Sequence, residues 1–267
     1  MGAQPDVTVA TAHDLAGPEG APAVVLIHGL GLSRAVTWDR IAPQLARDYR
    51  VLSYDLPGHG ESAPPEGALD LAALGAQVTA LMDAAGIARA ALVGFSLGGM
   101  INRRVAMDHP DRVSGLAILN SPHERGEALQ RKVEAQARAS AEGGPAATLD
   151  AALARWFTED FRDAEPERVA RVREAVLACD PQGYAAARRV LAEGVTELIR
   201  PVPRLRHPAL VMTCEDDIGS TPAMSWAIAG EMDEADVVIL PGLRHLGLVE
   251  RPDLFLAPLR GFLSRLA

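Results

Sequence analysis

Short, largely apolar runs recur along the chain, and each is bounded by polar or turn-forming residues. Such runs are typical of strands that are buried on both faces of a parallel sheet. We therefore expect six buried strands, and a carboxyl edge of the sheet at which the loops after these strands meet. The runs cover residues 23–27, 50–54, 91–95, 113–119, 209–212 and 237–240.

Helical patterns lie between several of these runs. In 70–86 the apolar residues recur with a period of about 3.6 residues, and Gly86 is a natural helix end. A last helix is predicted from Pro252 onward. The alternation of strands and helices predicts an α/β fold with a doubly wound, mostly parallel sheet.

The segment between the fourth and fifth strands breaks this alternation. It reads as four helices, at 124–140, 147–157, 165–178 and 183–198. We therefore predict a core formed by 1–122 and 205–267, with an all-helical cap at 123–204. Four aromatic residues lie in the cap, in a chain with only 4% aromatics, and they favour a lid over a ligand pocket. The alternative is that Trp156, Phe157, Phe161 and Tyr184 form only the small core of the insert.

The stretch Gly94-Phe95-Ser96-Leu97-Gly98-Gly99 follows a predicted strand and precedes a helical pattern. In that context a Gly-x-Ser-x-Gly sequence indicates a sharp turn that exposes a nucleophilic serine. Glycine is needed there because larger neighbours would clash with the turn. Ser96 is the candidate nucleophile.

Serine needs a general base, and the base needs an acid that orients it. His245 lies a few residues after the last predicted strand, where its loop reaches the carboxyl edge of the sheet. Asp217 follows the preceding strand and comes before Ser220-Thr221-Pro222, a helix-start signal. Asn120, at the end of an earlier strand, cannot carry a charge, so we expect Asp217 to be the acid.

An oxyanion needs N–H donors that are already in place. We expect the backbone amide of Leu97, directly after Ser96, to be one donor. The amide of Leu30, in the loop after His28-Gly29, is expected to be the other. Trp156 is the candidate substrate-binding residue in the cap.

These motifs together resemble the α/β-hydrolase superfamily over nearly the whole chain. They are HGLG at 28–31, DLPGHGES at 55–62, GFSLGG at 94–99, EDD at 215–217 and RHLGLVERP at 244–252. The order serine, acid, histidine is the order expected in that fold. Within the superfamily the chain is similar to 3-oxoadipate enol-lactonase-like enzymes and small carboxylesterases, and the stretch at 180–186 is similar to part of their cap. Cys214 stands where that group usually has glycine.

The resemblance and the residues imply a serine hydrolase that cleaves a small carboxylic ester or lactone through an acyl-enzyme, without cofactor or metal. A carbon–carbon bond hydrolase of ring-cleavage products and a cofactor-free perhydrolase remain alternatives with the same residues. A small-molecule receptor without activity is a further alternative from another class. Fold alone does not decide among these functions.

Composition narrows the partners that we expect. The net charge of -9, from 26 basic and 35 acidic residues, argues against binding to nucleic acid or to anionic membranes. Cys179 and Cys214 are too few for a disulfide framework. The N-terminus shows no secretory signal, and no apolar run is long enough to span a membrane. We expect a cytoplasmic monomer or homodimer with a small-molecule partner.

Overall fold

The computed structural model describes residues 11–266, and its centre is a seven-stranded sheet. The strand order is β1-β3-β2-β4-β5-β6-β7, and every neighbouring pair is parallel except β1 with β3. This confirms the predicted doubly wound α/β sheet. The strands are β1 His13–Ala16, β2 Ala23–Ile27, β3 Arg50–Tyr54, β4 Ala90–Phe95, β5 Val113–Leu119, β6 Ala209–Cys214 and β7 Ala235–Leu240.

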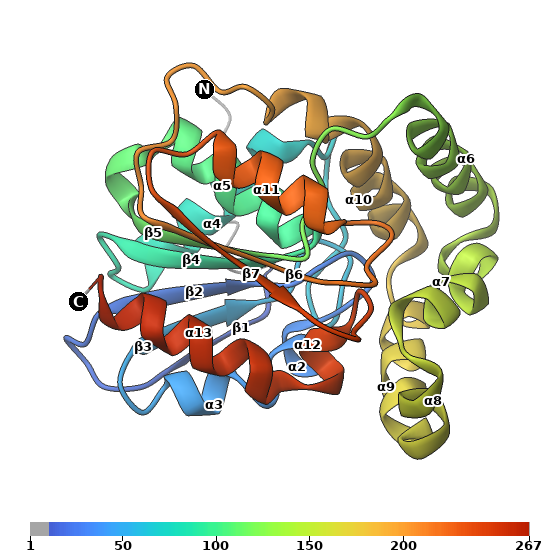
Figure 1. Cartoon of the computed structure of the whole chain (residues 1–267), viewed down its shortest axis with the longest axis horizontal. Coiled ribbons are helices and arrows are strands. Elements are labelled where there is room, and N and C mark those ends of the chain that lie inside the picture. The colour runs from blue at the N-terminus through green and yellow to red at the C-terminus, as the bar shows by residue number, and fades with distance from the viewer. Residues whose placement is uncertain (1–10, 267) are drawn as a thin grey trace.

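Helices cover both faces of the sheet (Figure 1). One face carries α4 Leu71–Ala84, α5 Leu97–Asp108 and α11 Pro222–Gly230, and the 3-10 helix η1 Pro110–Arg112 follows α5. The other face carries α2 Arg34–Thr37, α3 Ala42–Leu45, α12 Gly247–Glu250 and α13 Pro252–Ser264. Because both faces are covered, all six residues of β4 are buried, as expected for a central parallel strand.

The segment between β5 and β6 is helical, as predicted, and lies at one end of the sheet (Figure 1). We call it the cap. It consists of α6 Glu127–Gly143, η2 Pro145–Thr148, α7 Leu149–Trp156, α8 Glu159–Ala164, α9 Pro166–Leu177, α10 Pro181–Glu193 and η3 Gly194–Glu197. The side chain of Asp180 accepts a hydrogen bond from the Gly183 amide and so stabilises the N-terminus of α10. With Pro181 as its first residue, α10 begins two residues before the predicted position.

Several short elements were missed from the sequence, and β1 and α8 show why. The edge strand β1 has no apolar run, since most of its residues are exposed and only its backbone pairs with β3. Helix α8 is short and highly charged, and none of its residues is buried. In both elements, contacts with the rest of the fold stabilise a segment whose own pattern is uninformative.

No helix within residues 11–266 is both long enough and apolar enough to cross a membrane. The absence of a secretory signal is a prediction about the N-terminus, and most of that segment lies outside the described residues.

Candidate active site

Ser96 occupies the sharp turn between β4 and α5. Its backbone has φ 55° and ψ −110°, an unusual conformation for a residue with a side chain. Two hydrogen bonds hold it there: the Ser96 amide donates to the Leu119 carbonyl at 2.8 Å, and Ser121 Oγ donates to the Ser96 carbonyl at 2.9 Å. Strain that the surroundings enforce in this way is typical of functional sites.

The glycines around Ser96 allow backbone segments to touch. A Cβ atom on Gly94 would lie 2.1 Å from the Gly98 carbonyl oxygen, and one on Gly98 would lie 2.2 Å from the Ile27 carbonyl oxygen. Real Cβ atoms do not approach backbone atoms so closely. The first turn of α5 therefore packs directly on the ends of β4 and β2, which explains both glycines of the Gly-x-Ser-x-Gly sequence.

His245 lies between Ser96 and Asp217. Its Nδ1 atom is 2.6 Å from Asp217 Oδ2, and its Nε2 atom is 3.2 Å from Ser96 Oγ. A carboxylate can only accept, so Nδ1 carries the proton and neutral His245 presents an unprotonated Nε2 to the Ser96 hydroxyl. The imidazole is flanked by the rings of Phe95 and Trp156, with centroids at 5.2 and 6.3 Å.

Asp217 is buried, and its carboxylate is fully engaged. Oδ1 accepts hydrogen bonds from the amides of Gly219 and Ser220, both at 2.9 Å, and Oδ2 accepts from Asn120 Nδ2 at 2.9 Å as well as from His245. Burial alone would raise the pKa of Asp217, but the positive charge of His245 in its protonated form and these hydrogen bonds lower it below its ordinary value. The carboxylate therefore stays ionised near neutral pH. Asp216 and Glu215, the two acids directly before Asp217, are exposed.

Asn120 is a part of the site that the sequence reasoning set aside. It follows β5 with φ 45°, and its side chain donates to Asp217 instead of replacing it. The sequence feature that could have identified Asn120 is its position at the end of a central strand, because the neighbouring strand carries the predicted acid at the same edge of the sheet. Asparagine suits that place because it tolerates the left-handed conformation and supplies a neutral donor.

The two predicted amide donors lie close to Ser96. Leu30 lines the cavity beside Ser96, and Gly29 before it approaches Ser96 so closely that a Cβ there would lie 3.1 Å from Ser96 Cβ. Leu97 is the first residue of α5, so its amide has no acceptor within the helix. Among the described residues, neither amide donates a hydrogen bond to another group.

His28 and His59 have structural surroundings. His28 is fully buried; its Nε2 accepts from the Leu56 amide at 2.9 Å, and its Nδ1 lies 2.7 Å from the Gly29 carbonyl oxygen. Burial lowers the pKa of His28 to about 4 and that of His59 to about 4, so both rings are neutral at pH 7. They hold the loops after β2 and β3.

A cavity of about 100 Å³ lies next to Ser96 and His245, between the sheet edge and the cap. Trp156 lines it, as predicted. The other three aromatic residues of the cap are not part of the lining. Phe157 stacks on Phe161 at 5.3 Å within the cap, and Tyr184 packs against His59 at 6.3 Å. The remaining cap residues in the lining are mostly aliphatic or basic.

The cap is tied to the loop that carries His245. The Leu246 amide donates to the Trp156 carbonyl at 2.9 Å. Arg244 Nη1 donates to the Ala154 and Phe157 carbonyls at the end of α7, and Glu250 accepts from the amide and hydroxyl of Thr158. Both neighbours of His245 therefore contact the cap, and this fixes Trp156 over the imidazole.

Other reactive groups in the described chain are not arranged for chemistry. Cys214 is buried at the end of β6, and burial raises the pKa of its thiol to about 12, so a thiolate is disfavoured. Within residues 11–266, no group of three or more histidine, cysteine or acidic side chains is placed to bind a metal ion.

Known proteins resemble this chain in sequence and in fold. The family model for the α/β-hydrolase fold matches residues 22–252. The chain is 29% identical to an (E)-2-((N-methylformamido)methylene)succinate hydrolase from Acinetobacter baylyi over 91% of this chain and 90% of the relative. It is also 29% identical to 3-oxoadipate enol-lactonase 2 from the same organism, over 92% of each chain.

A solved structure extends this likeness. The enol-lactonase from Burkholderia xenovorans superposes with a TM-score of 0.85 at 30% identity, over 95% of this chain and 96% of that one. The match covers the core and the cap alike, and it agrees with the sheet topology and with the helical segment between β5 and β6. The chain therefore belongs to the α/β-hydrolase fold family.

Proposed function

We propose that this protein is a serine hydrolase that cleaves a small carboxylic ester or lactone through an acyl-enzyme. The observation that carries this proposal is the continuous set of contacts from Ser96 Oγ to His245 Nε2, at 3.2 Å, and from His245 Nδ1 to Asp217, at 2.6 Å. A nucleophile within reach of a base, and a base oriented by a buried carboxylate, is the arrangement that acyl transfer requires.

In the proposed reaction, His245 Nε2 takes the proton of Ser96 while Ser96 Oγ attacks the carbonyl carbon. The carbonyl oxygen becomes an oxyanion, and the amides of Leu30 and Leu97 donate to it. Each such donor contributes on the order of 3 kcal/mol to stabilising the transition state. Imidazolium then forms beside Asp217, whose negative charge stabilises it.

The second half of the reaction, in which the acyl-enzyme is hydrolysed, uses the same residues with water as the nucleophile. Protonated His245 gives its proton to the leaving oxygen, and the acyl group stays on Ser96. Neutral His245 then takes a proton from water, which attacks the acyl carbon and releases the acid. A lactone follows the same path, except that its leaving oxygen remains attached to the acyl chain.

The similar proteins support this reaction class. One relative named above is a 3-oxoadipate enol-lactonase, and an enol-lactonase is among the similar solved structures. Another similar structure is an esterase from Thermogutta terrifontis, 26% identical with a TM-score of 0.85. Lactone and ester hydrolysis need the same nucleophile, base and oxyanion donors, and these are the residue types found around the cavity.

A fluorophosphonate is expected to label Ser96 and no other residue. The strained turn presents the hydroxyl to His245, and the resulting alkoxide displaces fluoride from phosphorus. Intact-mass measurement should show one adduct per chain. The Ser96→Ala variant should give no adduct, whereas Ser264→Ala, which alters an exposed hydroxyl on α13, should still give one. An adduct that persists in Ser96→Ala would refute the assignment of the nucleophile.

Short acyl chains are expected to react faster than long ones, because the cavity has a volume of only about 100 Å³ and Trp156 lines it on the cap side. From 4-nitrophenyl butyrate to 4-nitrophenyl decanoate, kcat/KM should fall at least about tenfold, since unaccommodated methylenes are excluded. Trp156→Ala should shift the optimum toward longer chains. A steady rise of kcat/KM with chain length in the unaltered enzyme contradicts a compact pocket.

The same assays separate the alternatives. Turnover of 4-nitrophenyl esters and lactones, but not of vinylogous diketones, supports ester chemistry over carbon–carbon bond cleavage. Peracid formation from an ester and hydrogen peroxide at a rate above hydrolysis identifies a perhydrolase. A protein that binds small esters without turning them over, and that no fluorophosphonate labels, is a receptor.

A further inference from the structure

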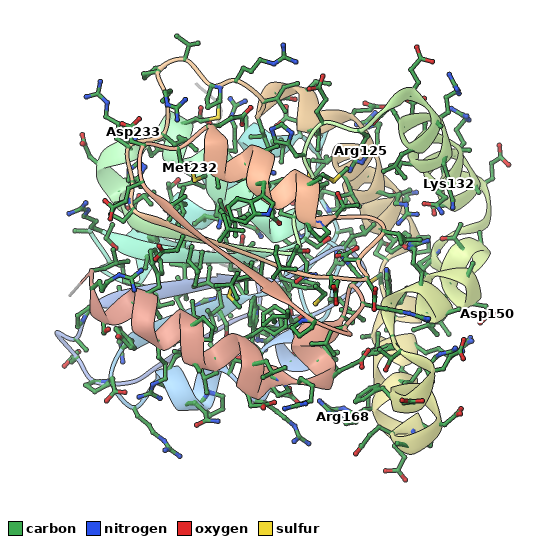
Figure 2. All side chains as sticks on the ribbon, viewed as in Figure 1. Arg125, Lys132, Asp150, Arg168, Met232 and Asp233 are labelled. Carbon is green, nitrogen blue, oxygen red and sulfur yellow. The ribbon has the colours of Figure 1, made fainter. Side chains whose placement is uncertain are left out.

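The cavity beside Ser96 is lined by basic side chains, although the chain as a whole is acidic. Four basic residues line it in addition to His245: Arg125, Lys132, Arg155 and Arg188. Among the described lining residues, Asp217 is the only acid, and its carboxylate is already engaged by His245 and by three further donors. Figure 2 shows Arg125 and Lys132 among the cap helices, on α6 and the loop before it. The cap therefore places an uncompensated positive charge over the site.

Among these residues, Arg188 on α10 is the one whose surroundings most clearly lack a negative charge. Its side chain is almost completely buried, with the residue 4% exposed. Its Nη2 atom donates to Gln136 Oε1 at 3.0 Å, but its Nε atom is buried without an acceptor in the described structure. A buried guanidinium whose only side-chain partner is a neutral amide is unfavourable, and buried charges are normally paired. An anionic group in the cavity would supply the acceptor and the charge that Arg188 lacks.

Arg155 on α7 reinforces the positive charge. It is partly buried, and within residues 11–266 it makes no hydrogen bond or ion pair. Burial lowers the pKa of Arg155, the nearby charge of Arg188 lowers it further, and the charge of Asp217 opposes both effects. The two guanidinium groups therefore lie within electrostatic reach of each other. Like charges brought together in a buried cavity repel, and a bound anion relieves that repulsion.

Two exposed arginines of the cap, in contrast, have acidic partners. Arg173 pairs with Asp150, which Figure 2 shows on the outer side of the cap, and Arg131 pairs with Glu127. Acidic partners are thus available on the outer surface and are missing from the cavity. The basic lining is a property of the pocket and does not reflect the general composition of the cap.

Arg125 has a partly structural role. Its Nη2 donates to the Leu191 carbonyl at 3.1 Å, at the carboxyl end of α10. A cation at this end of a helix is also favoured by the helix dipole. We therefore expect Arg125 to contribute to the positive electrostatic potential of the pocket, and Arg155 and Arg188 to contact a ligand directly.

We propose that Arg188 and Arg155 bind a carboxylate of the substrate, so that the ester or lactone cleaved at Ser96 carries a free carboxylate group. This inference rests on the proposed function. The guanidinium fork matches the two oxygens of a carboxylate, and charge-assisted hydrogen bonds of this kind are among the strongest in proteins. The carboxylate also anchors a small substrate whose apolar area is too limited to bind tightly.

Two matched substrates test the proposal. 4-Nitrophenyl hydrogen glutarate and 4-nitrophenyl methyl glutarate differ in a single charge at the far end of the acyl chain. The enzyme should prefer the anionic ester in kcat/KM. In Arg188→Gln the ratio of anionic to neutral kcat/KM should fall roughly 10- to 100-fold.

The control variant is Arg189→Gln. Arg189 is the next residue of α10, is exposed, and does not line this cavity. Its ratio should equal that of the unaltered enzyme, which separates a local contact from the overall charge. A preference for the neutral ester in the unaltered enzyme, or an equal ratio in Arg188→Gln and the unaltered enzyme, overturns the proposal.

A binding measurement separates this inference from the proposed function. Calorimetry with Ser96→Ala should detect glutarate, and the additional Arg188→Gln change should weaken its Kd roughly tenfold or more. Phosphate that binds more tightly than glutarate overturns the assignment to a carboxylate. Glutarate binding without fluorophosphonate labelling of Ser96 refutes only the hydrolase mechanism. Labelling without any anion preference refutes only the carboxylate site.

Discussion

Replacing Asp217 by asparagine is expected to lower kcat by on the order of 10⁴ while the protein stays folded. Asparagine keeps the shape of the side chain but removes the charge that stabilises protonated His245. Its amide can also turn an N–H toward Nδ1, which would favour the wrong imidazole tautomer and place a proton on Nε2. Steady-state hydrolysis of 4-nitrophenyl butyrate measures the loss, and circular dichroism checks the fold.

Asp216→Asn is the matched control, because it makes the same chemical change one residue earlier. Asp216 is exposed, and only its backbone amide is engaged, by the Leu243 carbonyl at 3.0 Å. Its substitution should change kcat less than about threefold, in keeping with the small effects of exposed surface changes. Equal losses in the two variants would show that the loop acts through its overall charge and that Asp217 has no specific contact with His245.

The strands and the candidate catalytic residues could be read from the sequence because their signals are local. A buried parallel strand must be a short apolar run, and the observed β2, β3 and β5 coincide with the predicted ranges. The turn at Ser96 requires glycines at fixed positions. Asp217 and His245 each follow a strand, and parallel strands bring their carboxyl ends to one edge.

Asn120 could not be found in this way, because its role depends on a partner 97 residues away. From the sequence, the acid must be a residue that can carry a negative charge, and Asn120 was excluded because it cannot. The structure shows that the place next to the acid is filled by a donor. A carboxylate that loses water on burial needs such donors, and their identity depends on which strands are neighbours.

The cap was the least predictable part, since helix packing and pocket lining use the same apolar residues. Phe157 and Phe161 stack on each other, although their clustering in sequence had suggested a lid over the pocket. The sequence does not distinguish Arg155 and Arg188 from the other arginines of the cap helices. Only the three-dimensional arrangement shows that they line a cavity whose one acid among the described lining residues, Asp217, is already engaged by His245 and other donors.

Replacing Gly98 by alanine is expected to destabilise the protein by on the order of 3 kcal/mol or more and to abolish turnover. The added Cβ would lie 2.2 Å from the Ile27 carbonyl oxygen and 2.9 Å from that of His28. These are backbone atoms in β2 and the loop after it, so no side-chain rotation relieves the clash. Helix α5 must instead move away from β2, and this separates the Leu97 amide from the Leu30 loop.

Gly261→Ala is the control, and it is expected to change the stability of the protein in the opposite direction. Gly261 lies inside α13, is exposed, and has no atom within 4 Å of the position that a Cβ would occupy. Alanine is favoured over glycine in a helix interior by about 1 kcal/mol, so this variant should unfold at a higher denaturant concentration than the unaltered protein. Urea unfolding of both variants, with 4-nitrophenyl butyrate turnover, measures the contrast. A Gly98→Ala protein as stable and active as the unaltered one would show that α5 can shift freely, and that the close contact of α5 with β2 does not hold Ser96 in place.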